Sequence, residues 1–297
     1  MIGKKGRART RLILDCRRSN RHFVEAPGVD LLSAEGLSRI ERTEEGARLG
    51  PVVVGAAAVK DCFHRLRVSL RLGRFFCCPR GSAKEFGMSG KDIDVARLGA
   101  GNIIGPCAAV LHMGWRSLYF AQSANYNVLC RTTMLRAIRV ATDRGGAMVL
   151  GSPSEGGQWR YLYADSIGVF SRDEMHVKQA MAEAAEGFNG AGLLLHEGAM
   201  TVGGADVLGV TVDGERERTA LTNERFWRVR KAVRYGLQLR GGISGQELEV
   251  LVGHSTFCGL AVRESLSVGH ASCELMEKRL RQPGRALDER AGGAGGV

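Results

Sequence analysis

At 297 residues and 44% hydrophobic content, the chain is long and apolar enough to bury a substantial core, which excludes a wholly disordered protein. Its 42 Lys and Arg against 31 Asp and Glu give a formal charge of +11, which favours a polyanionic partner such as nucleic acid. A basic soluble protein without such a partner would have the same composition, so charge nominates only a class of partner.

The cysteines predict a reduced protein. They are scattered, mostly in apolar runs, and form no CxxC pair: Cys16, Cys62, Cys77, Cys78, Cys107, Cys130, Cys258 and Cys273. We interpret them as core residues, and we prefer this to a zinc site built from the unusual order His254, Cys258, His270 and Cys273. With no secretory signal and no apolar run of about 20 residues, we expect an intracellular, non-membrane protein, in the cytoplasm or the nucleus.

The first half of the chain predicts both helices and strands. Residues 31–40 are expected to be helical, and the apolar run Val52–Val59 predicts a buried strand in the centre of a sheet. Residues 72–106 are expected to form an insertion that is irregular from about residue 80, and 110–140 carries a mostly helical pattern. The glycines between 99 and 105 miss the GxGxxG spacing, which argues against dinucleotide binding.

The second half opens with a glycine-rich breaker at 151–157. Residues Trp159–Phe170 alternate bulky positions about Asp165-Ser166, which predicts a hairpin. Apolar residues at helical spacing from 177 to 188 predict an amphipathic helix, with Ser171 or Asp173 as its N-cap. A strand at 207–212 and a basic helix at 223–239 follow, and the Gly- and Ala-rich residues 283–297 are expected to be disordered.

Two segments near the strands resemble the palm motifs of reverse transcriptases from retroelements. Val59–Leu66 resembles the motif written D-h-x-D-x-[FY], with Asp61 as its second carboxylate and Phe63 as its aromatic gate. Ala58 stands five residues before Phe63, where the family has its leading Asp. Tyr163-Ala164-Asp165-Ser166 resembles the Tyr-x-Asp-Asp hairpin, with Asp165 retained and Ser166 in place of the second Asp.

Two further segments resemble the nucleotide-binding motifs of the same family. Arg11–Asn20 is similar to the motif in which an Arg, and a Lys seven residues before it, hold the triphosphate, and this implies Arg11 and Lys4. Leu111–Trp115 and the helix after it resemble the segment that contacts template and base, which implies Met113, Gly114 and Gln122. The spacing between Trp115 and Gln122 is one residue shorter than in the family.

A weaker resemblance extends beyond these motifs. The segment from Gly192 to Val210 is similar to the link between palm and thumb. His196 is the nearest substitute for the family's lysine, but we prefer to interpret it as a plain loop residue. The basic helix would suit a thumb that grips the primer–template backbone. Its candidate nucleic-acid contacts are Arg225, Trp227, Arg228 and Lys231.

The resemblance implies an α+β right-hand polymerase, with an antiparallel palm sheet packed on helices. Its expected parts are fingers at 1–50, a palm at 51–215 that contains the insertion 72–106, and a helical thumb-like region at 216–282. The implied activity is RNA-directed DNA synthesis from deoxynucleoside triphosphates on an RNA or DNA primer–template, with two Mg²⁺ ions. Asp165 and Asp61 are the candidate catalytic and metal-binding residues.

The missing carboxylates predict that this activity is impaired. Ala58 offers no oxygen and Ser166 a neutral one, whereas Mg²⁺ needs several hard oxygen ligands. We therefore expect weak or absent metal binding and polymerisation. The alternative functions are a non-catalytic nucleic-acid-binding relic of a retroelement and a decayed reading frame without function.

Overall fold

The computed structural model describes residues 2–3, 10–11, 16–41, 43–88, 103–113, 115, 118–196, 198–216, 218–238, 244–270 and 274. Helices lie at α1 Arg17–Asn20, α2 Ala34–Leu37, α3 Glu44–Arg48, α4 Cys62–Arg65, α5 Leu70–Gly73, α6 Leu118–Leu129, α7 Thr133–Ala137, α8 Glu174–Gly190, α9 Asn223–Gln238 and α10 Gly245–Ala261. Short 3₁₀ helices lie at η1 Arg74–Phe76, η3 Pro153–Glu155 and η4 Arg263–Gly269.

The centre of the fold is a five-stranded sheet in the order β11-β4-β10-β9-β7. Its strands are β4 Val53–Ala58, β7 Arg139–Val140, β9 Trp159–Tyr163, β10 Ser166–Ser171 and β11 Ala199–Val202. The first four strands of that order pair antiparallel, whereas β7 pairs parallel with β9. The sheet expected from the sequence was wholly antiparallel, and the parallel β7 is a correction to it. It arises because β7 and β9 are joined by a crossover connection, residues 141–158, which contains β8 Met148–Val149 and η3 and returns the chain to the same end of the sheet.

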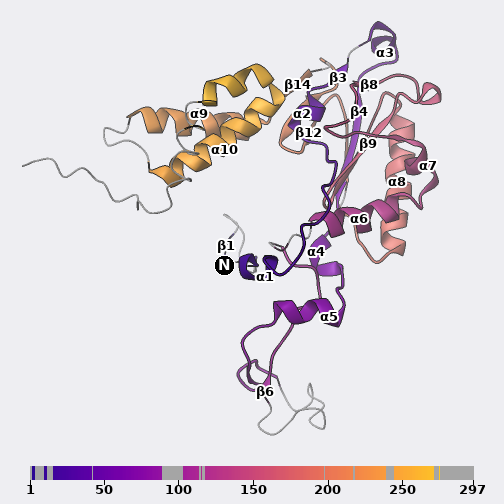
Figure 1. Ribbon diagram of the computed structural model, residues 1–297. Helices are drawn as coiled ribbons and strands as arrows, with labels where there is room; N and C mark the ends of the chain where they lie inside the picture. The colour runs from indigo at the N-terminus through magenta and orange to yellow at the C-terminus, as the bar shows by residue number, and fades with distance from the viewer. Residues whose placement is uncertain are drawn as a thin grey trace, which may run out of the picture.

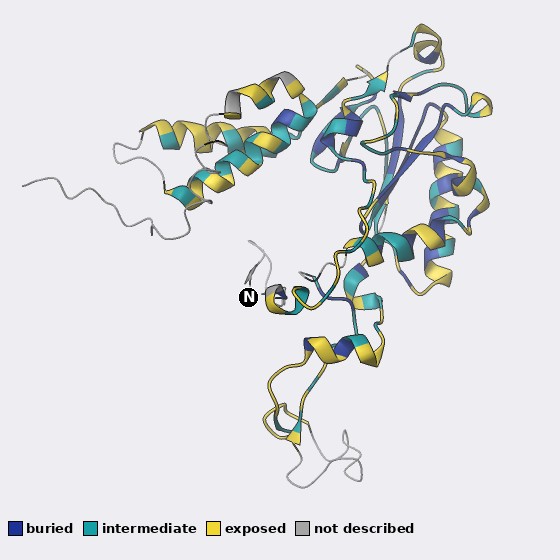
Figure 2. Ribbon diagram, viewed as in Figure 1, coloured by how far each residue is buried: buried dark blue, intermediate teal, exposed yellow. Residues whose placement is uncertain are grey.

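Alternation along each strand gives the sheet two apolar faces, as the period of two in a strand requires. Val53, Ile167 and Val169 belong to a core on one face, and Val54 and Phe170 belong to a second core on the other. Both faces are therefore covered, and Figure 2 shows the strands as the most buried part of the molecule.

Helices α6, α7 and α8 cover one face (Figure 1). The Asp173 side chain caps α8 by accepting from the His176 N–H at 3.0 Å, which decides between the two predicted caps. Gly55 allows α8 to lie close to the sheet, because a Cβ at this position would lie 2.7 Å from both Met181 and Val177 of that helix. Glu183 of α8 in turn accepts from the Thr133 N–H and thereby caps α7.

The other face is covered by α2, the C-terminal end of α10 and a three-stranded sheet of β12 Ala205–Val207, β13 Val210–Asp213 and β14 Arg218–Leu221. The strand predicted at 207–212 is wrong, because Leu208 and Gly209 adopt φ of 51° and 84° and turn the chain between β12 and β13. Positive φ at both central residues is what a tight hairpin of type I′ needs.

Two parts project from this body (Figure 1). One is the helical pair of α9 and α10, and no residue of α9 is buried. The other contains α5, η1, β5 Gly81–Ser82 and β6 Ile103–Ile104. We call residues 78–88 and 103–106 the arm; residues 89–102 between them, like the tail predicted at 283–297, lie outside the described residues. In the described part of the chain, every helix is too short or too polar to cross a membrane.

Some predicted elements need correction. Only the four-residue α2 is helical within residues 31–40, and Ile40 begins the strand β3 Ile40–Glu41. The pattern at 110–140 resolves into α6 and α7, with residues 130–132 between them, and ends in β7; the described residues 110–113 and 115 are not helical. The interpretation of the cysteines as reduced core residues is wrong for three of them, because Cys77, Cys78 and Cys107 are exposed and two of these form a disulfide. Cys77 and Cys107 meet because they are opposite partners in an antiparallel bridge. Cys16 and Cys62 are buried as expected.

Candidate active site

The candidate site lies at one end of the central sheet, where the end of β4, the start of β10 and the chain that leads into β11 are neighbours. Ala58 and Ser166 are direct partners in the β4–β10 ladder, and the Val59 N–H donates to the Asp165 carbonyl at 2.7 Å. On the other side of β4, the His196 N–H donates to the Ala58 carbonyl at 2.8 Å. The sheet thus brings together the two motifs that lie about a hundred residues apart in the sequence, with an alanine at their centre.

Asp165 lies in the two-residue turn between β9 and β10. Its neighbour Ala164 has a φ of 53°, in the left-handed region that strand-connecting turns of the primed types use. Residues with a Cβ rarely adopt this φ without support, because the Cβ crowds the backbone. We therefore expect contacts from neighbouring segments to hold the turn in this conformation.

Two side chains of α6 supply that support. Gln122 donates to the Leu162 carbonyl at 2.9 Å and accepts from the Ala164 N–H at 2.8 Å. The buried Asn125 donates to the Ala164 carbonyl at 2.6 Å. Gln122, predicted to contact the nucleotide, has both ends of its amide committed to the hairpin. The sequence reasoning missed Asn125, although its spacing of three residues from Gln122 puts both on one helix face.

Cys62 lies directly behind the turn and links it to α4. Burial raises the pKa of the Cys62 thiol, the hydrogen bond from Asn125 lowers it, and the nearby Asp165 carboxylate raises it further. The Asn125 amide donates to its sulfur at 3.3 Å. Because burial is the largest cause and the net shift of the pKa is upward, we expect a neutral thiol at Cys62.

The remaining residues of the first palm-like motif leave the sheet in different directions. Asp61 is exposed and adopts a φ of 51° as the N-cap of α4, without a capping hydrogen bond from its side chain. Phe63 is partly buried against the first core. Asp61 therefore follows β4 on the same end of the sheet as Asp165, but three residues beyond the position of Ala58.

The predicted nucleotide-binding residues are only partly described. Lys4 and Gly114 lie outside the described residues, as does the side chain of Arg11. Met113 is partly buried and forms a bridge with Trp115, which packs among Phe23, Phe76 and Phe120. Beside this cluster, burial and then the nearby His64 lower the pKa of His112.

The basic helix α9 is exposed along its length, but some of its cationic side chains already have partners within the chain. The Arg225 guanidinium lies 3.8 Å from the ring centre of Phe257 on α10, so it contributes to packing between the two helices. Arg228 pairs with Glu224 one turn earlier. Trp227 is 43% exposed beside Arg230, and Lys231 is exposed. The exposed cations and aromatic ring on this helix remain available to a partner.

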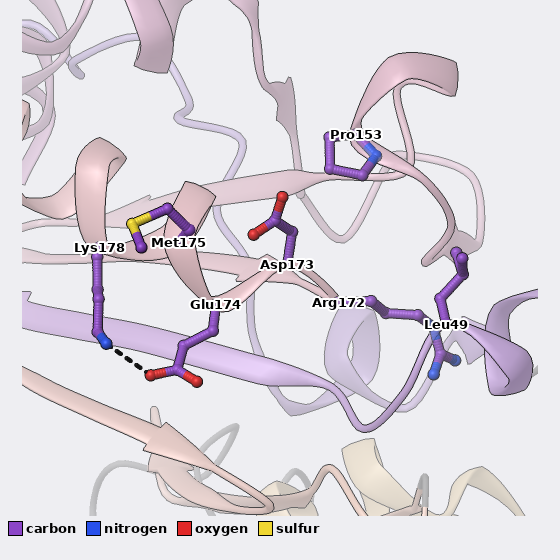
Figure 3. A pocket seen from close by; sticks show the side chains of 7 residues that line it. All are labelled: Leu49, Pro153, Arg172, Asp173, Glu174, Met175 and Lys178. Atoms are coloured by element: carbon purple, nitrogen blue, oxygen red, sulfur yellow. Dashed lines mark ion pairs between the residues drawn. The ribbon is translucent and has the colours of Figure 1, made fainter.

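A cavity of about 540 Å³ lies elsewhere, at the opposite end of β10 (Figure 3). Its polar side chains are engaged: Arg172 donates to the Gly50 carbonyl at 2.5 Å, Asp173 caps α8, and Glu174 pairs with Lys178 at 2.7 Å. Six residues of strand separate this cavity from Asp165, roughly 20 Å at the usual rise. We therefore do not connect it with the candidate site.

Comparison with known proteins finds a similarity in three-dimensional structure alone. No protein-family model and no curated protein matches the sequence. Solved structures do match. The foamy viral protease-reverse transcriptase dRH in complex with double-stranded DNA has a TM-score of 0.56 and a sequence identity of 12%, and the match covers 93% of this chain and 38% of that chain. The foamy viral protease-reverse transcriptase in complex with an RNA/DNA hybrid has a TM-score of 0.55 and an identity of 11%, and the match covers 90% of this chain and 28% of that chain. The same enzyme in complex with double-stranded DNA has a TM-score of 0.51 and an identity of 12%, with 94% of this chain and 50% of that chain covered.

The chain has a reverse-transcriptase-like fold. It spans 28% to 50% of the length of these chains, and at such identity the likeness concerns the fold alone. Within this fold, the pairing of Ala58 with Ser166 lies beside the hairpin tip.

The donor set at this edge does not fit the pair of magnesium ions that the fold family implies. Such a pair needs carboxylates that bridge both ions, because each ion takes about six oxygen ligands. Ala58 supplies no oxygen, Ser166 supplies a neutral hydroxyl, and Asp165 remains. Within the described ranges, no group of three or more His, Cys, Asp or Glu side chains is arranged to hold a metal. The predicted pair of Asp165 and Asp61 is thus too small a set.

Proposed function

We propose that this chain is a reverse-transcriptase-like domain of retroelement type that binds a nucleic-acid primer–template and supports little or no DNA synthesis. In this proposal the central sheet is the palm, the arm and the N-terminal residues belong to the fingers, and α9 with α10 is the thumb. The observation that carries it is the pair Ala58 and Ser166 on adjacent strands beside Asp165.

Impaired synthesis is supported by the chemistry of that pair. Both positions lie where carboxylates would have to converge on one cation site, and neither side chain carries a negative charge. A hydroxyl and a methyl group at this end of the sheet supply no negative charge that would hold a divalent cation. Binding without chemistry is therefore the function that the residues favour.

Nucleic-acid binding is supported by charge and exposure. The chain has a formal charge of +11, and α9 exposes Arg228, Lys231 and the ring of Trp227. Cations contact phosphates irrespective of sequence, and an aromatic ring can stack on a base or sugar. The foamy viral structures of similar fold were solved with double-stranded DNA and an RNA/DNA hybrid, which makes these the first ligands to test.

The experiment is titration of a labelled RNA/DNA hybrid with the whole chain, in EDTA, at several salt concentrations. Removing α9 contacts in Arg228→Gln/Lys231→Gln should lower affinity and reduce the salt slope by about one per lost contact. The matched control is Arg136→Gln/Arg144→Gln, which makes the same charge change on α7 and in an exposed turn. Equal effects of the two pairs, or no binding at low salt, would contradict the proposal.

A second candidate function is residual DNA synthesis that uses Asp61 with Asp165. It is favoured by the left-handed backbone of Asp61, because strained conformations of residues with side chains gather at functional sites. Loss of any residual primer extension in Asp61→Asn would support this candidate, and unchanged extension would reject it.

A further inference from the structure

The disulfide between Cys77 and Cys107 closes the base of the arm. The two residues are opposite partners in an antiparallel bridge. On the body side of the bridge, the Ala108 N–H donates to the Phe76 carbonyl at 3.2 Å. On the arm side, the Cys78 N–H donates to the Pro106 carbonyl at 2.8 Å. The bridge therefore lies in a continuous two-stranded ribbon, at the point where this ribbon enters the arm.

The bridge also marks the boundary between buried and exposed chain. Phe76, one residue before it, is 8% exposed and packs against Phe23 and Trp115. Among the described residues of the arm, Ala83 alone is buried. In the described part of the arm, the noncovalent contacts include the two-residue strands β5 and β6, a few backbone hydrogen bonds, and local hydrogen bonds between Ser82 and Glu85. So little buried surface gives weak local stability, and the covalent bond is the strongest constraint on the arm.

The bond is open to chemical exchange. Cys77 and Cys107 are both exposed residues, as is the free Cys78 beside them. Thiol–disulfide exchange requires only that a thiolate reaches one of the two sulfurs. Buried cysteines such as Cys16 and Cys62 lack that access.

We propose that Cys77 and Cys107 form a redox-sensitive clasp: oxidised, it orders the arm and fixes it to the aromatic cluster, and reduced, it releases the arm. A low-molecular-weight thiol attacks one sulfur, the Cys77–Cys107 bond breaks, and the other sulfur leaves as a thiolate that takes up a proton. A second such thiol attacks the mixed disulfide and frees the first cysteine, so two thiols are oxidised to one small disulfide while the clasp gains two electrons. A low-molecular-weight disulfide drives the reverse reaction.

The first test counts and maps thiols in the whole chain. After treatment with a low-molecular-weight disulfide and removal of excess reagent, peptide mapping of the denatured chain should find Cys77 joined to Cys107. Reduction should then release two more thiols from the unmodified chain than from Cys77→Ser/Cys107→Ser, which carries the same other cysteines. Cys78→Ser should keep the Cys77–Cys107 bond, and Cys77→Ser should lack it. Absence of this bond from the unmodified chain, or a bond between Cys78 and either cysteine in its place, overturns the proposal.

The second test measures arm order by trypsin cleavage after Arg80 and Lys84, both exposed. Reduction should speed this cleavage at least about tenfold in the unmodified chain and in Cys78→Ser, because the closed loop loses its constraint. Cys77→Ser should be cleaved fast in either state. Cleavage after Arg144, in an exposed turn of the body, should stay constant and reports that the fold is intact. Equal arm cleavage before and after reduction overturns the clasp, whatever the outcome for nucleic-acid binding.

Discussion

Replacing Gln122 by alanine tests the role that the structure gives to this side chain. The substitution removes a donor from the Leu162 carbonyl and an acceptor from the Ala164 N–H. Leaving a buried polar group unpaired costs about 1–3 kcal/mol, and the turn is part-buried, so we expect the free energy of unfolding to fall by roughly 2 kcal/mol. Loss of a nucleotide contact alone would leave stability unchanged.

The assay is urea unfolding of the whole chain, with Gln179→Ala as the matched control. Gln179 lies exposed on α8, so its replacement should change stability by no more than about 0.5 kcal/mol. Gln122→Glu should also destabilise, because it keeps the acceptor for the Ala164 N–H but loses the donor and adds charge near Asp165. If Gln122→Ala unfolds at the same urea concentration as Gln179→Ala, the amide does not hold the hairpin.

Three further predictions concern packing and pH. Gly168→Ala should lower the free energy of unfolding by more than about 2 kcal/mol in urea, because its Cβ would lie 2.2 Å from Tyr161. Hydrogen bonds from Ser244 lower the pKa of Glu247 below 4.5. The unmodified chain should therefore be more stable than Glu247→Ala above pH 4.5, and this difference should vanish as the pH falls through the lowered pKa. Thermal unfolding of both chains across that pH range measures it. Burial lowers the His112 pKa below 6.5, so stability should fall as pH drops from 6.5 toward that lower value, and His112→Phe should flatten this dependence.

Much of the sheet could be predicted because local pattern and tertiary environment agree there. The valine run before Ala58 has no polar position, as a strand buried on both faces requires, and it forms β4. The bulky alternation around Asp165 forms the hairpin of β9 and β10. Asp173 begins α8 because its side chain satisfies a free N–H of the first turn.

The rest depended on contacts between distant segments, which sequence spacing does not reveal. Gln122 reads equally well as a ligand-binding or a structural amide until the hairpin lies against it. Cys77 and Cys107 are 30 residues apart, and only the ribbon makes them neighbours. The strand at 207–212 was misjudged because Leu208 is an unusual residue for a left-handed turn.

The register of the β4–β10 ladder decides which side chains meet at this end of the sheet. A shift of one residue in the β4–β10 ladder would move every side chain to the other face. The observed register pairs Ala58 with Ser166, the two positions that the alignment marks as missing carboxylates. The roles of Lys4, Arg11, Met113 and Gly114 in nucleotide binding stay predictions.

Primer extension on an RNA template, with Mg²⁺ and then Mn²⁺, tests the central claim most directly. The unmodified chain is compared with Ala58→Asp and with Ala58→Asp/Ser166→Asp, which restore one and then both carboxylates. We predict that the unmodified chain is inert and that the double replacement extends the primer. Extension by the unmodified chain at the rate of the double replacement would contradict the account.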